Sequence, residues 1–438
     1  MTYPGYCESV STRWSEVGSV PAGWEARRLK FAVSLRNEKI EAEATNLEYM
    51  GLEHIESWTG KRIEDEAAFS DGVATRFVEG DVLFGKLRPY LAKVYLAEKE
   101  GIATTEALVL TAESALIPEF LKYVLLSAKF IDVVSGSTYG AKMPRANWDT
   151  IGDLPILLPP VGEQRHIVAL LEWKTGQIDA LIVKKQELIE KLKEKRLAAI
   201  THAVARGLDG AAPLRDSGIS SLGLMPAHWE VRRIRHCAEL VTSGSRGWAQ
   251  HFADSGALFL RITNLDRESI ALLLDDIQRV DPPEGSEGER TLTRANDLLI
   301  SITADLGSVA VIPAELEPAY VSQHLSLVRL DVSGMSAEWI AYSVLSHIGK
   351  FQLRMAGYGG TKVQLSLSDI KEIVFCQLPY EEQQQTLDFI RLETARADQL
   401  IALASQAIDR LVEYRTALIT AATTGKIDVR NVVVPAHA

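Results

Sequence analysis

The sequence predicts an α+β fold with two mixed α/β modules separated by a long antiparallel two-helix coiled coil, the whole forming a pseudo-twofold internal repeat. Three observations lead to this fold class. A 23-residue motif occurs twice, a long proline-free segment follows the start of each copy, and short strand-like runs fill the regions between them.

The repeated motif begins with Pro-x-x-Glu-Gln. Residues 160–182 read PVGEQRHIVALLEWKTGQIDALI and residues 379–401 read PYEEQQQTLDFIRLETARADQLI, so the second copy starts 219 positions later (379 − 160). Self-similarity at a fixed period indicates a duplicated structural unit. Aligned without a gap, the copies share seven identities: Pro160/Pro379, Glu163/Glu382, Gln164/Gln383, Thr175/Thr394, Asp179/Asp398, Leu181/Leu400 and Ile182/Ile401.

Shorter repeats occur in the same order in both halves. Because the stretches between the repeats match poorly, we interpret the repeated parts as scaffold and the divergent parts as the regions that discriminate between ligands. The paired segments are SVPAGWEARRLK (19–30) with LMPAHWEVRRIR (224–235), GDVLFGK (80–86) with NDLLISI (296–302), and YGAKMPRANWDTI (139–151) with YGGTKVQLSLSDI (358–370).

Each copy of the motif opens a long predicted helix. There is no proline from Glu163 to Ala205, and apolar residues recur at spacings of three and four, which places them on one helix face. About 43 residues make a helix of roughly 65 Å. No globular core is that wide, so the two helices are expected to pack on each other. Gly207 and Gly425 follow the helices as stop signals.

The order of segments along the chain sets the direction of the helices. If the modules lie at opposite ends of a helix pair, the second helix must run back towards the first module, and the C-terminus returns near the N-terminus. The predicted boundaries are 1–158 for the first module, 159–207 for the first helix, 208–377 for the second module, and 378–438 for the second helix and tail.

Both modules read as mixed α/β. The amphipathic segments 118–136 and 337–357 each predict a helix that ends in glycine. Apolar or alternating runs predict strands at 82–87, 106–112, 153–159, 257–263, 297–303, 308–313 and 325–330.

The bulk composition restricts the class of protein. Apolar residues make up 47% of the chain and charged residues 24%, which is typical of a globular protein. No apolar run approaches the roughly 18–20 residues of a membrane span, and the N-terminus lacks the pattern of a signal peptide. Cys7, Cys237 and Cys376 are far apart, which argues against a zinc site or disulfide framework and favours a cytoplasmic protein. A net charge of −11 is unusual for a free-standing DNA binder.

These motifs together resemble the specificity subunit of a type I restriction–modification system. The resemblance covers nearly the whole chain and rests on the paired Pro-x-x-Glu-Gln starts, on SGISSLGLMPAHWEVRRIR (217–235) and on GDVLFGKLRPYLAKV (80–94). It implies a non-catalytic subunit without cofactors, in which two target-recognition domains each read one half of a bipartite DNA site and the helices set the gap. It also implies that the partners are double-stranded DNA, two adenine methyltransferase subunits and, for restriction, motor-nuclease subunits. These subunits would share the clamping of DNA, which accounts for the acidic total.

Local basic segments supply the candidate DNA contacts. Arg and Lys reach guanine edges or phosphates, Asn and Gln suit adenine, and nearby glycines allow close backbone approach. The structural alternatives are a solvated strand edge, a loop charge, a turn-shaping Asn or a strand face. The candidates are Lys86, Arg88, Tyr90, Lys142 and Arg145 in the first module, and Arg261, Asn264, Ser301, Thr303, Lys362 and Gln364 in the second.

The paired glutamates and glutamines of the motif have two interpretations. Glu163, Gln164, Glu382 and Gln383 lie in first helical turns, where acidic side chains complement the helix dipole and cap the helix. The alternative is docking of a partner subunit. We interpret Trp24 and Trp229 as packing residues, and the arginines at 27, 28, 232 and 233 either lie along phosphates or face water.

Enzyme motifs are weak in this sequence. DPPE at 281–284 approaches the Asp-Pro-Pro-aromatic motif of adenine methyltransferases, but Glu284 replaces the aromatic residue that would stack on a flipped base. GSTYGAKM lacks the spacing of a P-loop. A fused enzyme is therefore disfavoured. Two hypotheses remain, a DNA-reading and scaffolding subunit and a coiled-coil adapter that binds proteins and not DNA.

Overall fold

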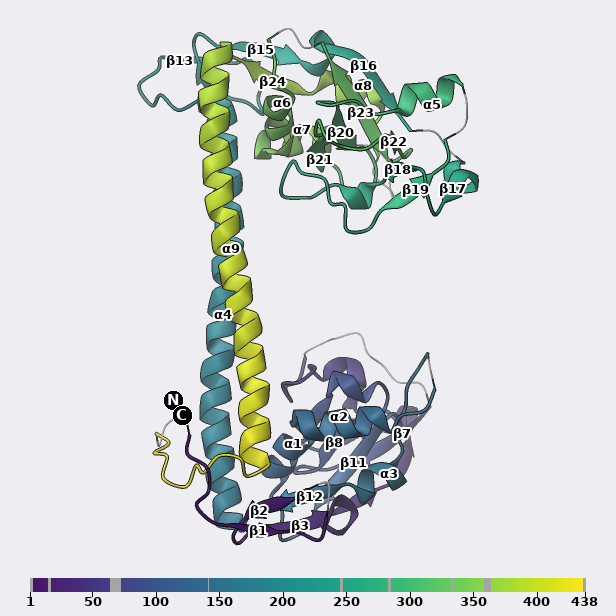
Figure 1. Cartoon of the computed structure of the whole chain (residues 1–438), viewed down its shortest axis with the longest axis vertical. Helices are drawn as coiled ribbons and strands as arrows, with labels where there is room; N and C mark the ends of the chain where they lie inside the picture. The colour runs from purple at the N-terminus through teal and green to yellow at the C-terminus, as the bar shows by residue number, and fades with distance from the viewer. Residues whose placement is uncertain are drawn as a thin grey trace. The chain divides into compact units, whose positions relative to one another are not determined.

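The computed structural model describes residues 3–14, 17–63, 72–140, 142–244, 247–282, 285–331, 334–357 and 364–435. The chain divides into two compact units: unit 1 consists of residues 1–185 and 406–438, and unit 2 of residues 186–405. Each unit contains one strand-rich module and part of two long helices, α4 (Val161–Arg206) and α9 (Tyr380–Thr423) (Figure 1). The predicted α+β class with long helices and an internal repeat is confirmed.

The module of unit 1 is built on two four-stranded sheets. The antiparallel sheet has the order β4 (Val33–Arg36), β11 (Ala107–Ala112), β8 (Val82–Gly85), β9 (Val94–Leu96). The other has the order β5 (Lys39–Glu41), β7 (Val73–Phe77), β10 (Gly101–Ala103), β6 (Tyr49–Met50), with β6 parallel to β10. Two-stranded ribbons pair β1 (Ser9–Ser11) with β2 (Ser19–Pro21) and β3 (Glu25–Arg28) with β12 (Pro155–Leu158). The helices are α1 (Pro118–Leu126), α2 (Ala128–Gly136) and α3 (Trp148–Asp153).

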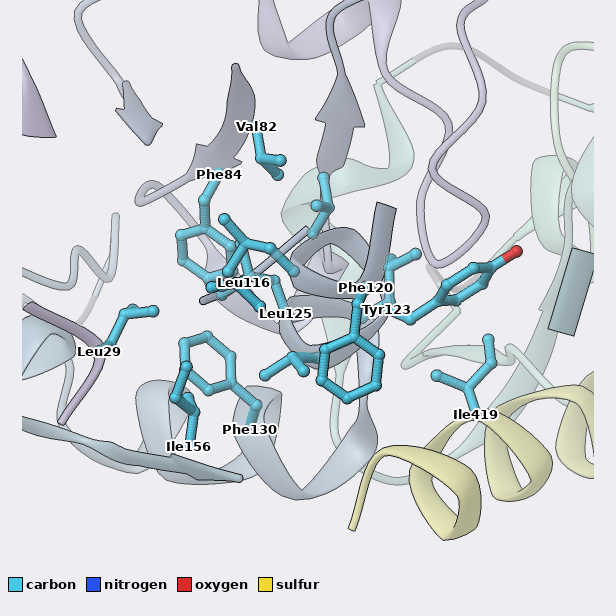
Figure 2. Close-up of a cluster of buried hydrophobic side chains, with 14 of the residues drawn as sticks. Leu29, Val82, Phe84, Leu116, Phe120, Tyr123, Leu125, Phe130, Ile156 and Ile419 are labelled. Atoms are coloured by element: carbon cyan, nitrogen blue, oxygen red, sulfur yellow. The ribbon is translucent and has the colours of Figure 1, made fainter. Parts of the chain in front are cut away.

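The central strand β8 divides its side chains between two cores, because successive residues of a strand point to opposite faces. Val82 and Phe84 pack in the cluster that contains α1 and α2. Leu83 packs in a second cluster with residues of the other sheet. Figure 2 shows the first cluster, in which Ile419 of α9 lies beside Tyr123. One long helix therefore contributes directly to the core of this module.

The module of unit 2 repeats this architecture. Leu298 and Ile300 pack in the cluster with the helices, and Leu299 packs with the other sheet. The sheet orders are β16 (Ala238–Ser243), β23 (Leu325–Leu330), β20 (Leu298–Ser301), β21 (Val309–Val311), and β17 (Phe252–Ala253), β19 (Gln278–Val280), β18 (Ala257–Leu260), β22 (Ala319–Val321). The ribbons pair β13 (Leu214–Asp216) with β14 (Leu224–Pro226) and β15 (Glu230–Arg233) with β24 (Val374–Gln377). The helices are α5 (Ser286–Thr291), α6 (Ala337–Leu345), α7 (His347–Ala356) and α8 (Leu367–Glu372).

Residues 118–136 and 337–357 each form two helices, and the prediction of a single helix in each segment was wrong. The breaks fall at Ser127 and Ser346, which are both buried. Ser127 Oγ donates to the carbonyl three residues before it at 2.7 Å, and Ser346 Oγ accepts from the amide three residues after it at 3.2 Å. Serine side chains compete in this way with the helical hydrogen bonds, so a serine can divide a segment whose apolar pattern is continuous.

In unit 1 the two long helices run antiparallel. Asp179 of α4 pairs with Arg415 of α9, and His166, nearer the start of α4, lies 2.8 Å from the carbonyl of Val429, beyond the end of α9. The Asp428 amide donates to the carbonyl of Pro4 at 2.7 Å. The predicted return of the C-terminal segment to the N-terminal one is therefore confirmed.

In unit 2 the helices are again antiparallel, since Arg196 near the end of α4 pairs with Asp398 in the first half of α9. The helices contain 46 and 44 residues, which correspond to roughly 69 and 66 Å. Gly207 and Gly425 adopt φ values of +69° and +67° just after the helices end, which confirms both as stop signals. In the described part of the chain, no helix combines the length and apolar character needed to span a bilayer.

Gly425→Ala is expected to destabilise unit 1 by about 1–3 kcal/mol, because an added Cβ would lie 2.6 Å from Pro21 Cγ on a left-handed backbone. The matched control is Gly176→Ala in α4, where a Cβ would meet nothing within 4 Å. That change is expected to stabilise the protein by roughly 0.5–1 kcal/mol. Urea denaturation followed by circular dichroism measures both free energies of unfolding, and a neutral Gly425→Ala would contradict the role assigned to this glycine.

Candidate nucleic-acid interface

Both modules carry the same arrangement of loops after a central strand. We call these loops the strand-end edge. It consists of residues 86–90, 139–140 and 142–145 in unit 1, and of residues 302–304 and 364 in unit 2. In unit 1 the Lys86 amide donates to the carbonyl of Glu106 at 2.9 Å, and the Lys86 carbonyl accepts from Ala146 at 3.0 Å. In unit 2 the same two bonds join Ile302 to His324 and Leu365, at 3.1 and 2.9 Å. Isolated bridges pair Leu87 with Arg145 and Thr303 with Gln364.

A left-handed residue stands at the same place in both strand-end edges. Arg88 has φ +50° and Ala304 has φ +59°, each three positions after the last residue of its strand. Non-glycine residues rarely adopt this conformation, and they cluster at functional sites. In unit 1 the residue after this turn, Pro89, is buried, and the next one, Tyr90, is exposed.

The strand-end edge of unit 1 brings together the predicted basic residues. Lys86 is half-buried, while Arg88 and Lys142 are exposed. Arg145 pairs with the carboxylate of Glu106 at 3.1 Å, and this hydrogen bond raises the pKa of the Arg145 guanidinium. The loop that carries Lys142 is closed by reciprocal backbone bonds between positions 139 and 145. These cations therefore form one local patch in an acidic chain.

Lys39 belongs to the same patch and was missed in the sequence. Its side chain donates to Thr75 Oγ1 at 2.8 Å. Partial burial, and next the nearby charge of Lys86, lower the pKa of Lys39. Lys39 stands 47 positions before Lys86 on another strand, so no local motif connects the two residues.

In unit 2 the predicted residues have different environments. Thr303 is half-buried, with Oγ1 2.9 Å from Nδ1 of His324. Arg261 pairs with Asp276 at 3.0 Å. Gln364 lies on the bridge to Thr303, and Lys362 lies outside the described residues.

Asn264 and Ser301 are buried and bonded within the module. The Asn264 amide accepts from the Arg261 backbone at 2.9 Å and donates to the carbonyls of Leu273 and Asp276, both at 2.9 Å. Ser301 Oγ donates to a carbonyl four residues later and accepts from the Ser308 amide. Neither side chain has a hydrogen-bonding group directed to solvent, so this placement matches the turn and strand-face alternatives rather than DNA contact.

The paired glutamates anchor tryptophans that precede them by more than a hundred residues. Glu163 Oε1 accepts from Trp24 Nε1 at 3.1 Å, and Glu382 Oε1 accepts from Trp229 Nε1 at 2.9 Å. Glu163 also accepts from the hydroxyl of Tyr6, whose pKa is raised by burial and then by this bond. Both indoles are buried, which confirms the tryptophans as packing residues.

The glycine that follows one long helix lies against the tryptophan bonded to the other. A Cβ on Gly207 would lie 2.9 Å from Trp229, and a Cβ on Gly425 would lie 3.4 Å from Trp24. Each unit thus has a corner made of a tryptophan, a helix start and a helix end. We call these the tryptophan corners.

The paired glutamines are fully buried and tie the long helices to the turn before α1 or α6. Gln164 accepts from the Ile117 amide at 2.9 Å and donates to the carbonyls of Ala115 and Pro159. Gln383 accepts from the Ser336 amide at 2.8 Å. These internal bonds give the repeated glutamines a structural role, and docking of a partner subunit at the repeated pair stays a prediction.

The double arginines of the repeated tryptophan segments are all paired with acids. The pairs are Arg27 with Glu25, Arg28 with Asp153, Arg232 with Glu230, and Arg233 with Glu372, at 2.8 to 3.2 Å.

Two repeated residues beyond the aligned motif were missed. Arg196 and Arg415 also differ by 219, and both are buried. Each pairs with the aspartate of the opposite helix, and each also reaches a module loop: Arg196 bonds Glu268 at 2.9 Å, and Arg415 donates to the carbonyl of Trp58 at 2.7 Å.

Thr201 and Thr420 form a second missed pair. Their hydroxyls accept from the first amides of α7 and α2, at 3.0 and 2.9 Å. Extending the ungapped alignment past residue 401 would have exposed both pairs.

No protein-family model matches the chain. The type I restriction enzyme EcoDI specificity subunit of Escherichia coli is 29% identical over 173 residues, which are 39% of this chain and 38% of that relative's length. The type I restriction enzyme MjaVIII specificity subunit of Methanocaldococcus jannaschii is 20% identical over 380 residues, which are 82% of this chain and 84% of that protein.

Solved structures share the fold. A chain from a study of complex assembly and conformational transition of the type I R-M system superposes with a TM-score of 0.72 at 20% identity, covering 93% of this chain and 99% of that one. The HsdS subunit from Thermoanaerobacter tengcongensis gives a TM-score of 0.50 at 20% identity, covering 93% and 98%. The relatives and the fold confirm the resemblance indicated by the sequence, which is to the specificity subunits of type I restriction enzymes.

Proposed function

We propose that the chain is the DNA-recognition and scaffolding subunit of a type I restriction–modification complex and has no catalytic activity of its own. The observation that carries the proposal is the strand-end edge, whose backbone is the same in both units while its side chains differ. Arg145 of unit 1 corresponds to Gln364 of unit 2. Arginine suits guanine and glutamine suits adenine, so one scaffold would read two different half-sites.

In this proposal each module is a target-recognition domain, with boundaries at 1–158 and 208–377. Lys86, Arg88, Tyr90, Lys142 and Arg145 contact one half of a bipartite site, and Lys39 adds a further cation. Arg261, Thr303, Lys362 and Gln364 contact the other half. Asn264 and Ser301 shape the loops that hold these residues.

The helices serve as the spacer and as docking surface for two methyltransferase subunits, to which motor-nuclease subunits are added for restriction. Leu181 and Leu400 support this role. They are identical positions of the repeat, and both are exposed, at 47% and 50%. The other repeated side chains at Glu163, Gln164 and Asp179 are bonded inside the protein, whereas exposed apolar residues commonly mark interaction surfaces.

Arg88→Ala is expected to weaken DNA binding by the full chain in complex with its methyltransferases. Loss of a phosphate contact would weaken binding to all duplexes and reduce the salt slope of log K by about 1, whereas loss of a base contact would raise Kd about tenfold and relax one position of the site. Fluorescence anisotropy at several salt concentrations distinguishes the loss of a phosphate contact from the loss of a base contact.

The control for this measurement is Lys129→Ala, which removes an exposed cation of α2. Equal affinity of the wild-type complex for all duplexes would favour the coiled-coil adapter over a DNA reader. An Arg88→Ala variant with unchanged affinity and salt slope would remove this residue from the interface.

Leu181→Lys and Leu400→Lys are each expected to remove one methyltransferase copy, because the lysine places a charge in an apolar contact. Native mass spectrometry reads the stoichiometry, which falls from two copies to one in each variant and to none in the double variant. The matched control is Leu188→Lys, since Leu188 is 47% exposed on α4 and its repeat counterpart is Ala407. Two copies bound to the double variant would refute this docking surface.

A further inference from the structure

A cavity in the module of unit 2 adjoins the strand-end edge. It has a volume of about 340 Å³, and His324 forms part of its wall. His324 Nδ1 lies 2.9 Å from Thr303 Oγ1. His324 therefore connects the cavity to the strand-end edge. We call the cavity the aromatic pocket, and its lining includes Trp248, Phe252, Phe259, Arg261, Ser322 and His324.

Among the phenylalanine and tryptophan side chains that line the pocket, Phe252 is the exposed one. Trp248 stacks on Phe259 with ring centroids 5.6 Å apart, and both residues are buried. Phe252 packs at a tilt against Phe259 and is 44% exposed. Stacking of a nucleobase on an aromatic side chain contributes about 1–3 kcal/mol.

Two polar groups of the pocket lack partners among the residues that the structure describes. Ser322 is only 4% exposed, and its Oγ has no hydrogen bond. Arg261 Nε is likewise buried and unbonded, although Nη2 of the same guanidinium donates to Asp276. Buried polar groups in folded proteins are almost always hydrogen-bonded. Both groups can donate a hydrogen to an acceptor such as a carbonyl oxygen.

Of the two unpartnered groups, the guanidinium has no counterpart in unit 1, whereas the hydroxyl has a counterpart that is already hydrogen-bonded. The parallel pairs β6–β10 and β18–β22 align Met50 with Leu260 and Ala103 with Val321. The next residues are Gly51 and Thr104 in unit 1, where unit 2 has Arg261 and Ser322. Thr104 Oγ1 accepts from an amide at 3.3 Å. A difference of this kind is expected if the two modules recognise different bases.

We propose, on the basis of the proposed function, that the aromatic pocket receives one nucleobase turned out of the duplex in the half-site bound by unit 2. The base stacks on Phe252 and places a carbonyl oxygen against Arg261 Nε and Ser322 Oγ. Thymine fits best, because it combines a carbonyl acceptor with a methyl group that suits the apolar walls.

The test uses the full chain in complex with its methyltransferases and duplexes in which each base of both half-sites in turn faces a mismatched partner. Extrusion requires the base pair to break, so a mismatch at an extruded base tightens binding by about tenfold. A mismatch at a base read in the groove weakens binding. The adenines that are methylated serve as internal positive controls, because methyltransferases also flip their target base.

We expect tighter DNA binding when the mismatch lies at a methylated adenine, and also when it lies at one further position. That further position should belong to only one of the two half-sites. The further tightening should disappear in Phe252→Ala, shrink in Ser322→Ala and persist in Phe252→Tyr, which keeps the ring. Phe31→Ala, which removes an exposed aromatic residue of unit 1, is the matched control and should retain it.

Tightening at the methylated adenines alone would overturn the pocket proposal and leave the proposed function standing. A further tightening that survives both Phe252→Ala and Ser322→Ala would also overturn it, because the extruded base would then lie elsewhere. A complex without any sequence preference would overturn the proposed function itself.

Discussion

The hydrogen bond from a buried indole to a helix-start glutamate is the interaction on which the rest of the molecule depends. In the tryptophan corner of unit 1, Glu163 holds Trp24, and Gly425 leaves room for the ring. Bonds to an ionised acceptor are stronger than neutral ones, and this one joins segments that are more than a hundred residues apart. Glu382 and Trp229 repeat it in unit 2. The corner therefore fixes where a module begins relative to the helices that follow it.

From each corner, a series of buried polar contacts ties the long helices to the module. The glutamines hold the turn before the first module helix, the threonines hold the start of the second, and the arginines reach a loop of the module. All of these contacts use residues that recur with a spacing of 219. The strand-end edge lies on this scaffold but does not take part in it, which leaves its side chains free to differ between the units.

The sequence predicted the long helices and the strands well, because both depend on local periodicity, and it predicted the repeat because the two copies of the motif can be aligned without a gap. It failed at Ser127, where a local bond from the serine hydroxyl to a carbonyl three residues earlier accompanies a break in a continuous apolar pattern. For Asn264 it left a turn-shaping role and DNA contact open, because the bonds of this side chain reach a loop twelve residues away. Lys39 could not be placed near Lys86 from its neighbours in the sequence, because Lys39 lies on a strand of one sheet and Lys86 follows a strand of another, and only the tertiary fold brings their charges within range of each other. Arg196 and Arg415 were within reach, since their spacing repeats that of the motif.

The most direct test is to sequence the methylome of a host whose modification complex carries this chain, and to compare it with a host in which residues 33–154 are replaced by the corresponding segment of another specificity subunit. This replacement leaves Trp24, Glu163 and Gly425 in place. The account predicts a methylated site of two defined parts separated by unspecified bases, with only one part changed by the replacement. A contiguous site, or a change in both parts, would contradict it.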